Sequence, residues 1–191
     1  MDEIEIEIEI EVAVGGPVTV REMRPEDEAG VGRLFAACED YFVAATGAPA
    51  LPADVQSLYY ALPDGADFEQ KRLLVVCRGE DDVVGLADVV DRCPDVGSCS
   101  VGVFLVAPEV RRQGVGAGVA RRLIEEAAGR GMRTVLATCP GDWEPGVGFL
   151  RSLGFAIGGP EAAAATTVGN RTRHPGESGL RTARLKVVAD R

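Results

Sequence analysis

Histidine, paired cysteines and long apolar runs are all scarce in this chain of 191 residues. The single histidine, His174, cannot supply a histidine-rich metal site, so we expect no bound metal. No apolar run approaches the roughly 18 residues of a membrane-spanning helix, and we expect no membrane partner. The five cysteines are odd in number and include no C-x-x-C pair, which favours free thiols in a reducing compartment.

The chain also lacks the basic start of a secretory or transit peptide, because it opens Met-Asp-Glu-Ile-Glu-Ile. We therefore expect a cytoplasmic protein. Its net charge of −10 disfavours binding to nucleic-acid phosphates. The charge is uneven, since residues 1–30 carry −8, residues 31–99 carry −7 and residues 100–191 carry +5. This distribution favours an anion bound by the last part of the chain and a cation bound by the first.

Residues 2–14 alternate glutamate with isoleucine or valine, a pattern typical of a half-buried strand. Such a strand could join the edge of its own domain, remain a poorly ordered tail, or pair with a second subunit in a homodimer. Gly15, Gly16 and Pro17 then break the pattern. We expect an N-terminal strand extension over 1–17 and one domain over 18–191.

The rest of the sequence alternates between strand and helix patterns. Helices are predicted at 25–42, 55–62, 109–128 and within 141–155, and residues 158–179 have the composition of a loop. Strands are predicted at 18–23, 71–77, 83–90, 98–107, 133–139, 155–157 and 180–188. This order, an antiparallel meander followed by strand–helix–strand, predicts an α/β fold with a mixed, mostly antiparallel central sheet flanked by helices.

The most informative segment spans residues 103–124. A strand ends at Pro108, the basic turn Arg111-Arg112-Gln113 follows, and Gly114-Val115-Gly116-Ala117-Gly118 opens an amphipathic helix. Glycines at a helix N-terminus let a ligand approach the backbone closely, and the unpaired N–H groups there attract phosphate oxygens. A lone Gly-x-Gly is more typical of a flexible turn or of tight helix packing. Here the preceding strand, the two arginines, the three alternate glycines and the following helix favour a phosphate site.

Other phosphate-binding motifs do not fit this segment. The P-loop pattern G-x-x-x-x-G-K-[ST] is absent, and the dinucleotide fingerprint G-x-G-x-x-G would need a glycine where Val119 stands. That fingerprint also follows the first strand of a parallel unit, whereas this turn follows an antiparallel run. Neither H-E-x-x-H nor G-x-S-x-G occurs. The remaining interpretation of this segment is a nucleotide-phosphate site of another kind.

The run Arg111-Arg112-Gln113-Gly114-Val115-Gly116 matches [QR]-x-x-G-x-[GA], and here the chain resembles the GNAT acetyltransferase superfamily. Residues 149–155, FLRSLGF, are similar to the family's F-Y-x-x-L-G-F segment, and residues 18–27 are similar to its opening strand and helix. The resemblance covers about residues 18–157. It implies a GNAT-like fold, with the Glu/Ile strand as an N-terminal addition.

The resemblance also implies acetyl-CoA as co-substrate and a small-molecule or peptide amine as acceptor. By this resemblance the backbone from Gln113 to Gly118 holds the pyrophosphate, with Arg111 and Arg112 beside it. Phe104, Leu105 and Val106 pair with the pantetheine arm like an added strand, and a backbone N–H near Leu105 or Val106 polarises the thioester carbonyl. Leu150 is expected to line the same site.

Two positions depart from the family pattern. Many members protonate the departing thiolate with a tyrosine where this chain has Leu150, which cannot donate a proton. Trp143 stands where an asparagine is often found. Cys139, Tyr59 and Tyr60 are alternative donors or ordinary packing residues, and water could also serve. A non-catalytic acyl-CoA-binding module is therefore the alternative to an N-acetyltransferase, and a dinucleotide-binding protein is a third hypothesis.

Carboxylates near the expected acceptor regions are candidates for the general base. Asp88 is the first choice, because its apolar neighbours predict partial burial and a raised pKa. Glu39 and Asp40 are further candidates on the first predicted helix. Asp91 follows the same strand as Asp88 and is a fourth candidate. The alternative for each of the four is a solvated surface carboxylate. His174 lies in the polar loop, where it is either exposed to solvent or in contact with substrate.

Overall fold

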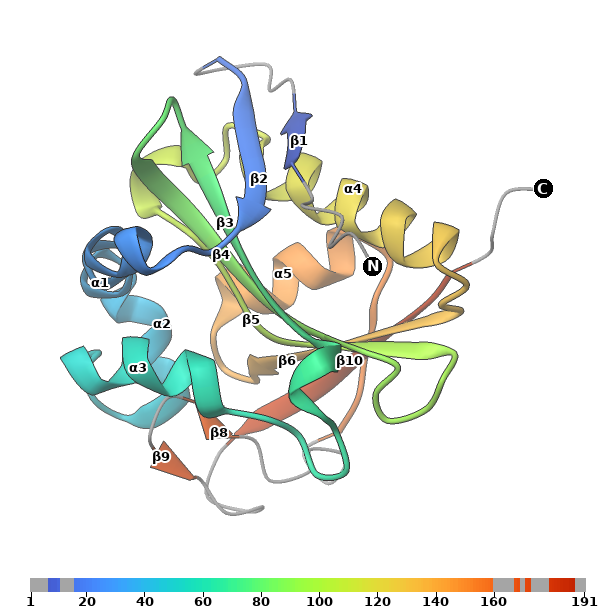
Figure 1. The fold of residues 1–191 in the computed structure, drawn as a ribbon. Coiled ribbons are helices and arrows are strands. Elements are labelled where there is room, and N and C mark those ends of the chain that lie inside the picture. Colours follow the sequence, from blue (N-terminus) through green and yellow to red (C-terminus); the bar gives the residue numbers. More distant parts are fainter. Residues whose placement is uncertain (1–6, 11–15, 160–166, 169–170, 173–178, 188–191) are drawn as a thin grey trace.

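The computed structural model describes residues 7–10, 16–159, 167–168, 171–172 and 179–187. Eight strands form one sheet in the order β1–β2–β3–β4–β5–β6–β10–β7 (Figure 1). Neighbouring strands are antiparallel except β5 and β6, which are parallel. The mixed, mostly antiparallel sheet predicted from the sequence is therefore confirmed.

The strands follow the predicted apolar runs closely, because each run is bounded by glycine, proline or charged turn residues. Their bounds are β1 Glu7–Ile10, β2 Val18–Glu22, β3 Lys71–Arg78, β4 Asp82–Asp91, β5 Ser98–Val106, β6 Thr134–Pro140, β7 Ala156–Ile157 and β10 Leu180–Lys186. Within the predicted loop at 158–179, β8 (Thr167–Val168) and β9 (Arg171–Thr172) pair as a separate two-stranded sheet. The predicted site candidate His174 lies outside the described residues.

Helices cover both faces of the sheet, with α1, α2 and α3 on one side and α4 and α5 on the other (Figure 1). Their bounds are α1 Glu28–Ala37, α2 Glu39–Thr46, α3 Pro52–Tyr60, α4 Val115–Gly129 and α5 Glu144–Ser152, with short 3-10 turns at Pro25–Asp27, Phe68–Gln70 and Pro108–Val110. Within the described ranges, no helix has the length and apolar composition needed to cross a lipid bilayer.

Two helix predictions were wrong in detail. The single helix expected over 25–42 is interrupted at Cys38, whose φ and ψ of −89° and 34° are not helical, so α2 begins in a new direction. The helix expected from residue 109 begins only at Val115. Arg112 and Gly114 have positive φ values of 62° and 89°, which no right-handed helix accommodates.

The core lies on both faces of the central strands, and every residue of β4 from Val83 to Val90 is buried. Phe42, Leu74, Leu86 and Leu105 are the largest side chains that are almost wholly buried. At the sheet edge, β1 pairs with β2 and places Ile8 opposite Val20. The rest of the predicted strand over 2–14 lies outside the described residues.

Candidate functional site

Strands β5 and β6 separate in the middle of the sheet. They pair only where Ser98–Val101 lies beside Thr134–Ala137, whereas β5 continues along β4 as far as Val106. From Gly102 to Val106, β5 therefore has no partner on its β6 side among the described strands. The Val106 carbonyl already accepts from Nε of Arg111, and the other backbone groups along this edge can pair with an extended ligand, as in peptide recognition by strand addition.

A bulge in β5 coincides with the separation. Asp88 of β4 pairs with Val103 and Val89 pairs with Val101, so Gly102 has no partner in the register. A β-bulge bends its strand and re-aims the neighbouring side chains. The structure thus opens the sheet next to Asp88, the favoured base of the sequence analysis.

The glycine-rich turn lies at the open end of this cleft. Gly114 caps α4 in a left-handed conformation. A Cβ placed on Gly116 would lie 3.3 Å from Cγ2 of Val106 and 3.6 Å from the ring of Phe149. Because the first N–H groups of a helix have no intrahelical partner, the start of α4 presents donors beside the free edge of β5. Arg112, at the same turn, is exposed.

Arg111 is held in place by three segments of the chain. Its Nε donates to the Val106 carbonyl at 2.9 Å, and its two terminal nitrogens donate to the carboxylate oxygens of Asp40 at 2.7 and 3.1 Å. Trp143 donates from Nε1 to the same carboxylate at 3.2 Å, and Arg111 lies 5.7 Å from the centre of the Trp143 ring. Arg111 therefore connects α2, the end of β5 and the loop before α5.

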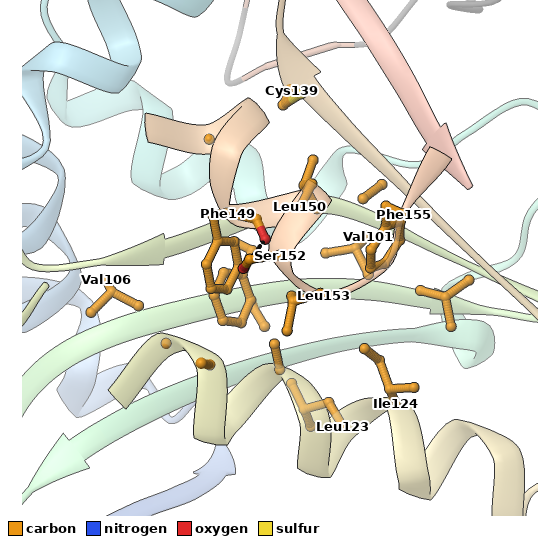
Figure 2. A pocket seen from close by; sticks show the side chains of 18 of the residues that line it. Val101, Val106, Leu123, Ile124, Cys139, Phe149, Leu150, Ser152, Leu153 and Phe155 are labelled. Atoms are coloured by element: carbon orange, nitrogen blue, oxygen red, sulfur yellow. Dashed lines mark hydrogen bonds between the residues drawn. The ribbon is translucent and has the colours of Figure 1, made fainter. Parts of the chain in front are cut away.

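The cleft opens into a cavity of about 820 Å³ between the sheet and helices α4 and α5. Its lining is mostly apolar, and Figure 2 shows how Val106, Phe149, Leu150 and Cys139 lie around part of it. At the mouth, the rings of Phe104 and Phe149 stack with centroids 5.6 Å apart. An apolar cleft bounded by a few polar groups is the usual form of a small-molecule site.

Most of the predicted cofactor residues line the cavity, two point into the core, and Gln113 and Gly118 are partly buried but absent from the cavity lining. Those that line the cavity are Phe104, Val106, Arg111, Arg112, Gly114, Gly116, Ala117 and Leu150. Leu105 and Val115 instead point into the core, where they are 1% and 3% exposed. Their contribution to a ligand site is thus limited to their backbone.

Asp88 is buried against Lys71 and does not line the cavity. Lys71 Nζ donates to Asp88 Oδ1 at 2.6 Å and to the Ala61 carbonyl at 2.8 Å. Burial raises the pKa of Asp88, while the charge and hydrogen bond of Lys71 act in the opposite direction. The predicted burial and raised pKa are thus confirmed, and the direction of the shift suits a proton acceptor.

The other two carboxylate candidates differ in setting. Glu39 is exposed at the start of α2. Burial acts to raise the pKa of Asp40, but the hydrogen bonds and charge of Arg111 outweigh it and lower that pKa overall. A carboxylate held by a bidentate arginine is a poor proton acceptor.

Two of the three tyrosines lie away from the cavity, and one lines it. Tyr59 and Tyr60, which the sequence analysis gives as alternative proton donors, are absent from the cavity lining, and Tyr60 is 73% exposed. Tyr41 of α2 lines the cavity beside Cys139 and Trp143, and its ring meets that of Trp143 edge-on at 5.5 Å. Burial raises the pKa of Tyr41, and the neighbouring Cys139, Asp88 and Cys38 add to the shift.

Cys139 of β6 is 5% exposed and lines the cavity near Leu150 (Figure 2). Burial raises the pKa of this thiol, although Arg181 acts to lower it. Cys139 therefore stays protonated at neutral pH. All five cysteines, each within the described residues, are unpaired and buried.

The model of the acetyltransferase (GNAT) family matches residues 32–155, and the chain therefore belongs to this family of acyltransferases. It is similar in structure to the GNAT domain of S. lividans PAT, with a TM-score of 0.66 and 15% identity over 95% of this chain and 97% of that one. A search of curated protein sequences gave no match.

Two further solved structures share the fold. An acetyltransferase from Thermus thermophilus has a TM-score of 0.61 and 19% identity, covering 89% of this chain and 97% of its own. A ribosomal-protein alanine N-acetyltransferase from Escherichia coli has a TM-score of 0.58 and 16% identity, covering 88% and 93%. The GNAT-like fold inferred from the glycine-rich turn is confirmed.

Proposed function

We propose that this protein transfers an acetyl group from acetyl-CoA to a primary amine. The observation that carries the proposal is the unpaired edge of β5 at Gly102–Val106, which meets the start of α4 beside an apolar cavity. An extended pantetheine arm can hydrogen-bond to that edge, and the pyrophosphate can accept from the first N–H groups of α4.

The local packing supports this assignment. Gly116 leaves a space that a side chain would fill, since a Cβ there would lie 3.3 Å from Val106 Cγ2. Arg112 lines the cavity, is exposed at the same turn and offers a positive charge to phosphate. Arg111 instead supports the turn through Val106 and Asp40. Each of its three guanidinium nitrogens already donates to a protein acceptor, so we do not assign it to the phosphate.

Acetyl transfer forms a bond from the amine nitrogen to the carbonyl carbon and breaks the bond from that carbon to sulfur. The amine must lose a proton and the sulfur must gain one. In our proposal Asp88 takes the amine proton, directly or through a water, because it is a buried carboxylate with a raised pKa beside the bulge at Gly102. Lys71 orients that carboxylate.

The proton for sulfur comes in this proposal from Tyr41. Leu150 lines the cavity at the position where many relatives carry a tyrosine, and its side chain holds no transferable proton. Tyr41 reaches the same cavity from α2, on the opposite wall. Cys139, which is buried and protonated between the two walls, is the alternative donor.

The acceptor in this proposal is a cationic amine, since residues 31–99, which include α2 and β4, carry a net charge of −7. A test is to incubate the protein with acetyl-CoA and a panel of polyamines, aminoglycosides and peptides with free N-termini. Thiol release and mass spectrometry of the amine are followed together. Amine-dependent release with an acetylated product is expected, whereas tight acetyl-CoA binding without turnover on any amine would indicate a binding module.

A further inference from the structure

The cavity extends beyond the separated strands and continues beneath α4. Its floor there is the sheet, through Leu74, Ala87, Val89 and Val101, and its roof is the face of α4 that carries Ala120, Leu123, Ile124 and Ala127. Figure 2 shows Leu123 and Ile124 on α4, with Leu153, Phe155 and Val101 around the same space. This part of the cavity lies beyond Gly102–Val106, the edge assigned above to the pantetheine arm.

A charged side chain stands at the far end of this space. Arg72 of β3 pairs with Val89 of β4, Val89 pairs with Val101 of β5, and Val101 pairs with Ala137 of β6. All four line the cavity, so they form one row across its floor. Val101 and Ala137 are also the last pair before β5 and β6 separate, and Arg72 lies two strands away, about 10 Å.

The Arg72 guanidinium is incompletely satisfied. Its side chain is 12% exposed, and its Nε makes a long contact of 3.4 Å with Oε1 of Glu22, a carboxylate that is 42% exposed. Its Nη2 is buried and has no hydrogen-bond partner among the residues that the structure describes. A buried guanidinium donor without an acceptor is costly, and a carboxylate is the acceptor that matches its geometry best.

The other carboxylate at this end, Asp91, is engaged by a second arginine. Arg130, at the end of α4, donates from Nη2 to Oδ1 of Asp91 at 3.2 Å and so engages that carboxylate. The charges of Arg72, Arg130 and Asp91 all act on Cys99, which lines the cavity between them. Asp91 is thus engaged by Arg130, and Glu22 meets only Nε of Arg72 at a long distance, which leaves Nη2 of Arg72 able to donate to an anionic ligand.

We propose that this part of the cavity binds an unbranched aliphatic chain that ends in a carboxylate, with the carboxylate at Arg72 and the chain beneath α4. A chain of about eight carbons spans the two strand spacings from Val101 to Arg72. The chain is either a free fatty acid or an acyl group on CoA with a carboxylate at its far end. Only the second source rests on the proposed function.

The test measures binding of octanoate to the full chain by calorimetry, with 1-octanol as the uncharged comparison. Octanoate is expected to bind with 1:1 stoichiometry and at least tenfold more tightly than the alcohol. Arg72→Met, which removes the charge and keeps the bulk, should weaken octanoate binding about tenfold or more and leave octanol unchanged. Arg78→Met is the matched control, because Arg78 lies on the same strand and is 44% exposed outside the cavity.

A second variant tests the space itself. Ala127 is 3% exposed and lines the roof, so Ala127→Leu should fill the distal part and abolish binding of both probes, whereas the start of α4 is untouched. Circular dichroism checks that each variant is folded. The proposal is wrong if octanoate fails to bind at millimolar concentration, or binds equally well to wild type, Arg72→Met and Ala127→Leu.

Competition between octanoate and CoA distinguishes a free fatty acid from an acyl group on CoA as the source of the chain. If octanoate and CoA bind together without weakening one another, the site holds a free fatty acid. If suberoyl-CoA, whose acyl group has eight carbons and a terminal carboxylate, binds more tightly than acetyl-CoA and loses that advantage in Arg72→Met, the chain belongs to the acyl group. Acetyl transfer to amines is measured on the same samples, so a failure of the proposed acetyltransferase activity is seen separately from a failure of octanoate binding.

Discussion

Arg111 and Asp40 are 71 residues apart in sequence and form a bidentate ion pair, with nitrogen–oxygen distances of 2.7 and 3.1 Å. The pair joins α2, on one side of the sheet, to the turn that precedes α4. Trp143 binds the same carboxylate and thereby adds the loop before α5. The two sides of the cleft are consequently held at a defined separation by one carboxylate.

Replacing this carboxylate should loosen the cleft without unfolding the protein. Because the Arg111 and Asp40 side chains are 25% and 41% exposed, we expect Asp40→Asn to lower the free energy of unfolding by about 0.5–1 kcal/mol. Urea titration at neutral pH measures the change. Asp82→Asn, in the exposed Arg78–Asp82 pair, is the control and should have a smaller effect. Equal losses in both variants would contradict the bridging role.

Gly116 tests the phosphate-binding turn. Gly116→Glu places a carboxylate and its bulk where Val106 and Phe149 already lie within 3.6 Å, so affinity for CoA should fall about 100-fold, or roughly 2.7 kcal/mol. Calorimetric titration with CoA gives the affinity. The matched control is Gly129→Glu at the other end of α4, where a side chain would meet nothing within 4 Å. Retained CoA binding in Gly116→Glu would overturn the assignment.

Tyr41 tests the proton donor. Tyr41→Phe removes only the hydroxyl, so kcat should fall about 100-fold while the KM for acetyl-CoA is unchanged. Steady-state thiol release measures both constants. Tyr60→Phe, on a side chain that is 73% exposed, should leave them unaltered. If kcat survives in Tyr41→Phe and collapses in Cys139→Ala, the thiol is the donor instead.

Asp88 tests the proposed general base. Since burial raises its pKa, the carboxylate gains a proton at a higher pH than an ordinary aspartate, and kcat/KM should decline as the pH falls through that raised value. Asp88→Asn should remove this acidic limb and lower the plateau at least 100-fold. The pH profile of thiol release is the measurement. An unchanged limb in Asp88→Asn would assign it to another group.

Asp27 tests a structural ion pair remote from the cavity. Arg21 donates to both its oxygens at 2.7 and 2.9 Å, and this hydrogen bonding lowers the pKa of Asp27 despite its burial. Asp27→Asn should cost about 3 kcal/mol at neutral pH, because it leaves Arg21 buried without its counter-charge. A lowered folded-state pKa stabilises the fold above the unfolded-state value. The difference between the two proteins should therefore shrink as the pH falls through the lowered pKa of Asp27, as acid-dependent urea titrations would show.

Local pattern was sufficient for most of the fold. Strand bounds followed from alternating or continuous apolar residues and from the turns at Gly and Pro. The break at Cys38 was not visible, because apolar residues continue at helical spacing on both sides of it. The positive φ of Arg112, 62°, was also not predicted, because no sequence pattern identifies a non-glycine residue that adopts this conformation.

The candidate site also has a part that the sequence predicts and a part that it does not. The glycine-rich turn is contiguous, so its role could be inferred from spacing alone, and the apolar neighbours of Asp88 predicted its burial. The contacts of Asp40 with Arg111 and Trp143 join residues 71 and 103 positions apart. The position of Tyr41 in the cavity likewise depends on how α2 packs against β6. These placements depend on tertiary packing, and a local sequence pattern contains no information about it.

The strand order has a consequence for synthesis. β10 lies between β6 and β7, which both precede it in the chain, and β7 pairs with no other strand. Until Leu180–Lys186 emerges from the ribosome, one edge of β6 lacks its antiparallel partner and can capture a foreign strand. The sheet therefore stays open between β6 and β7 until β10 has been made, although both of those strands precede it in the chain.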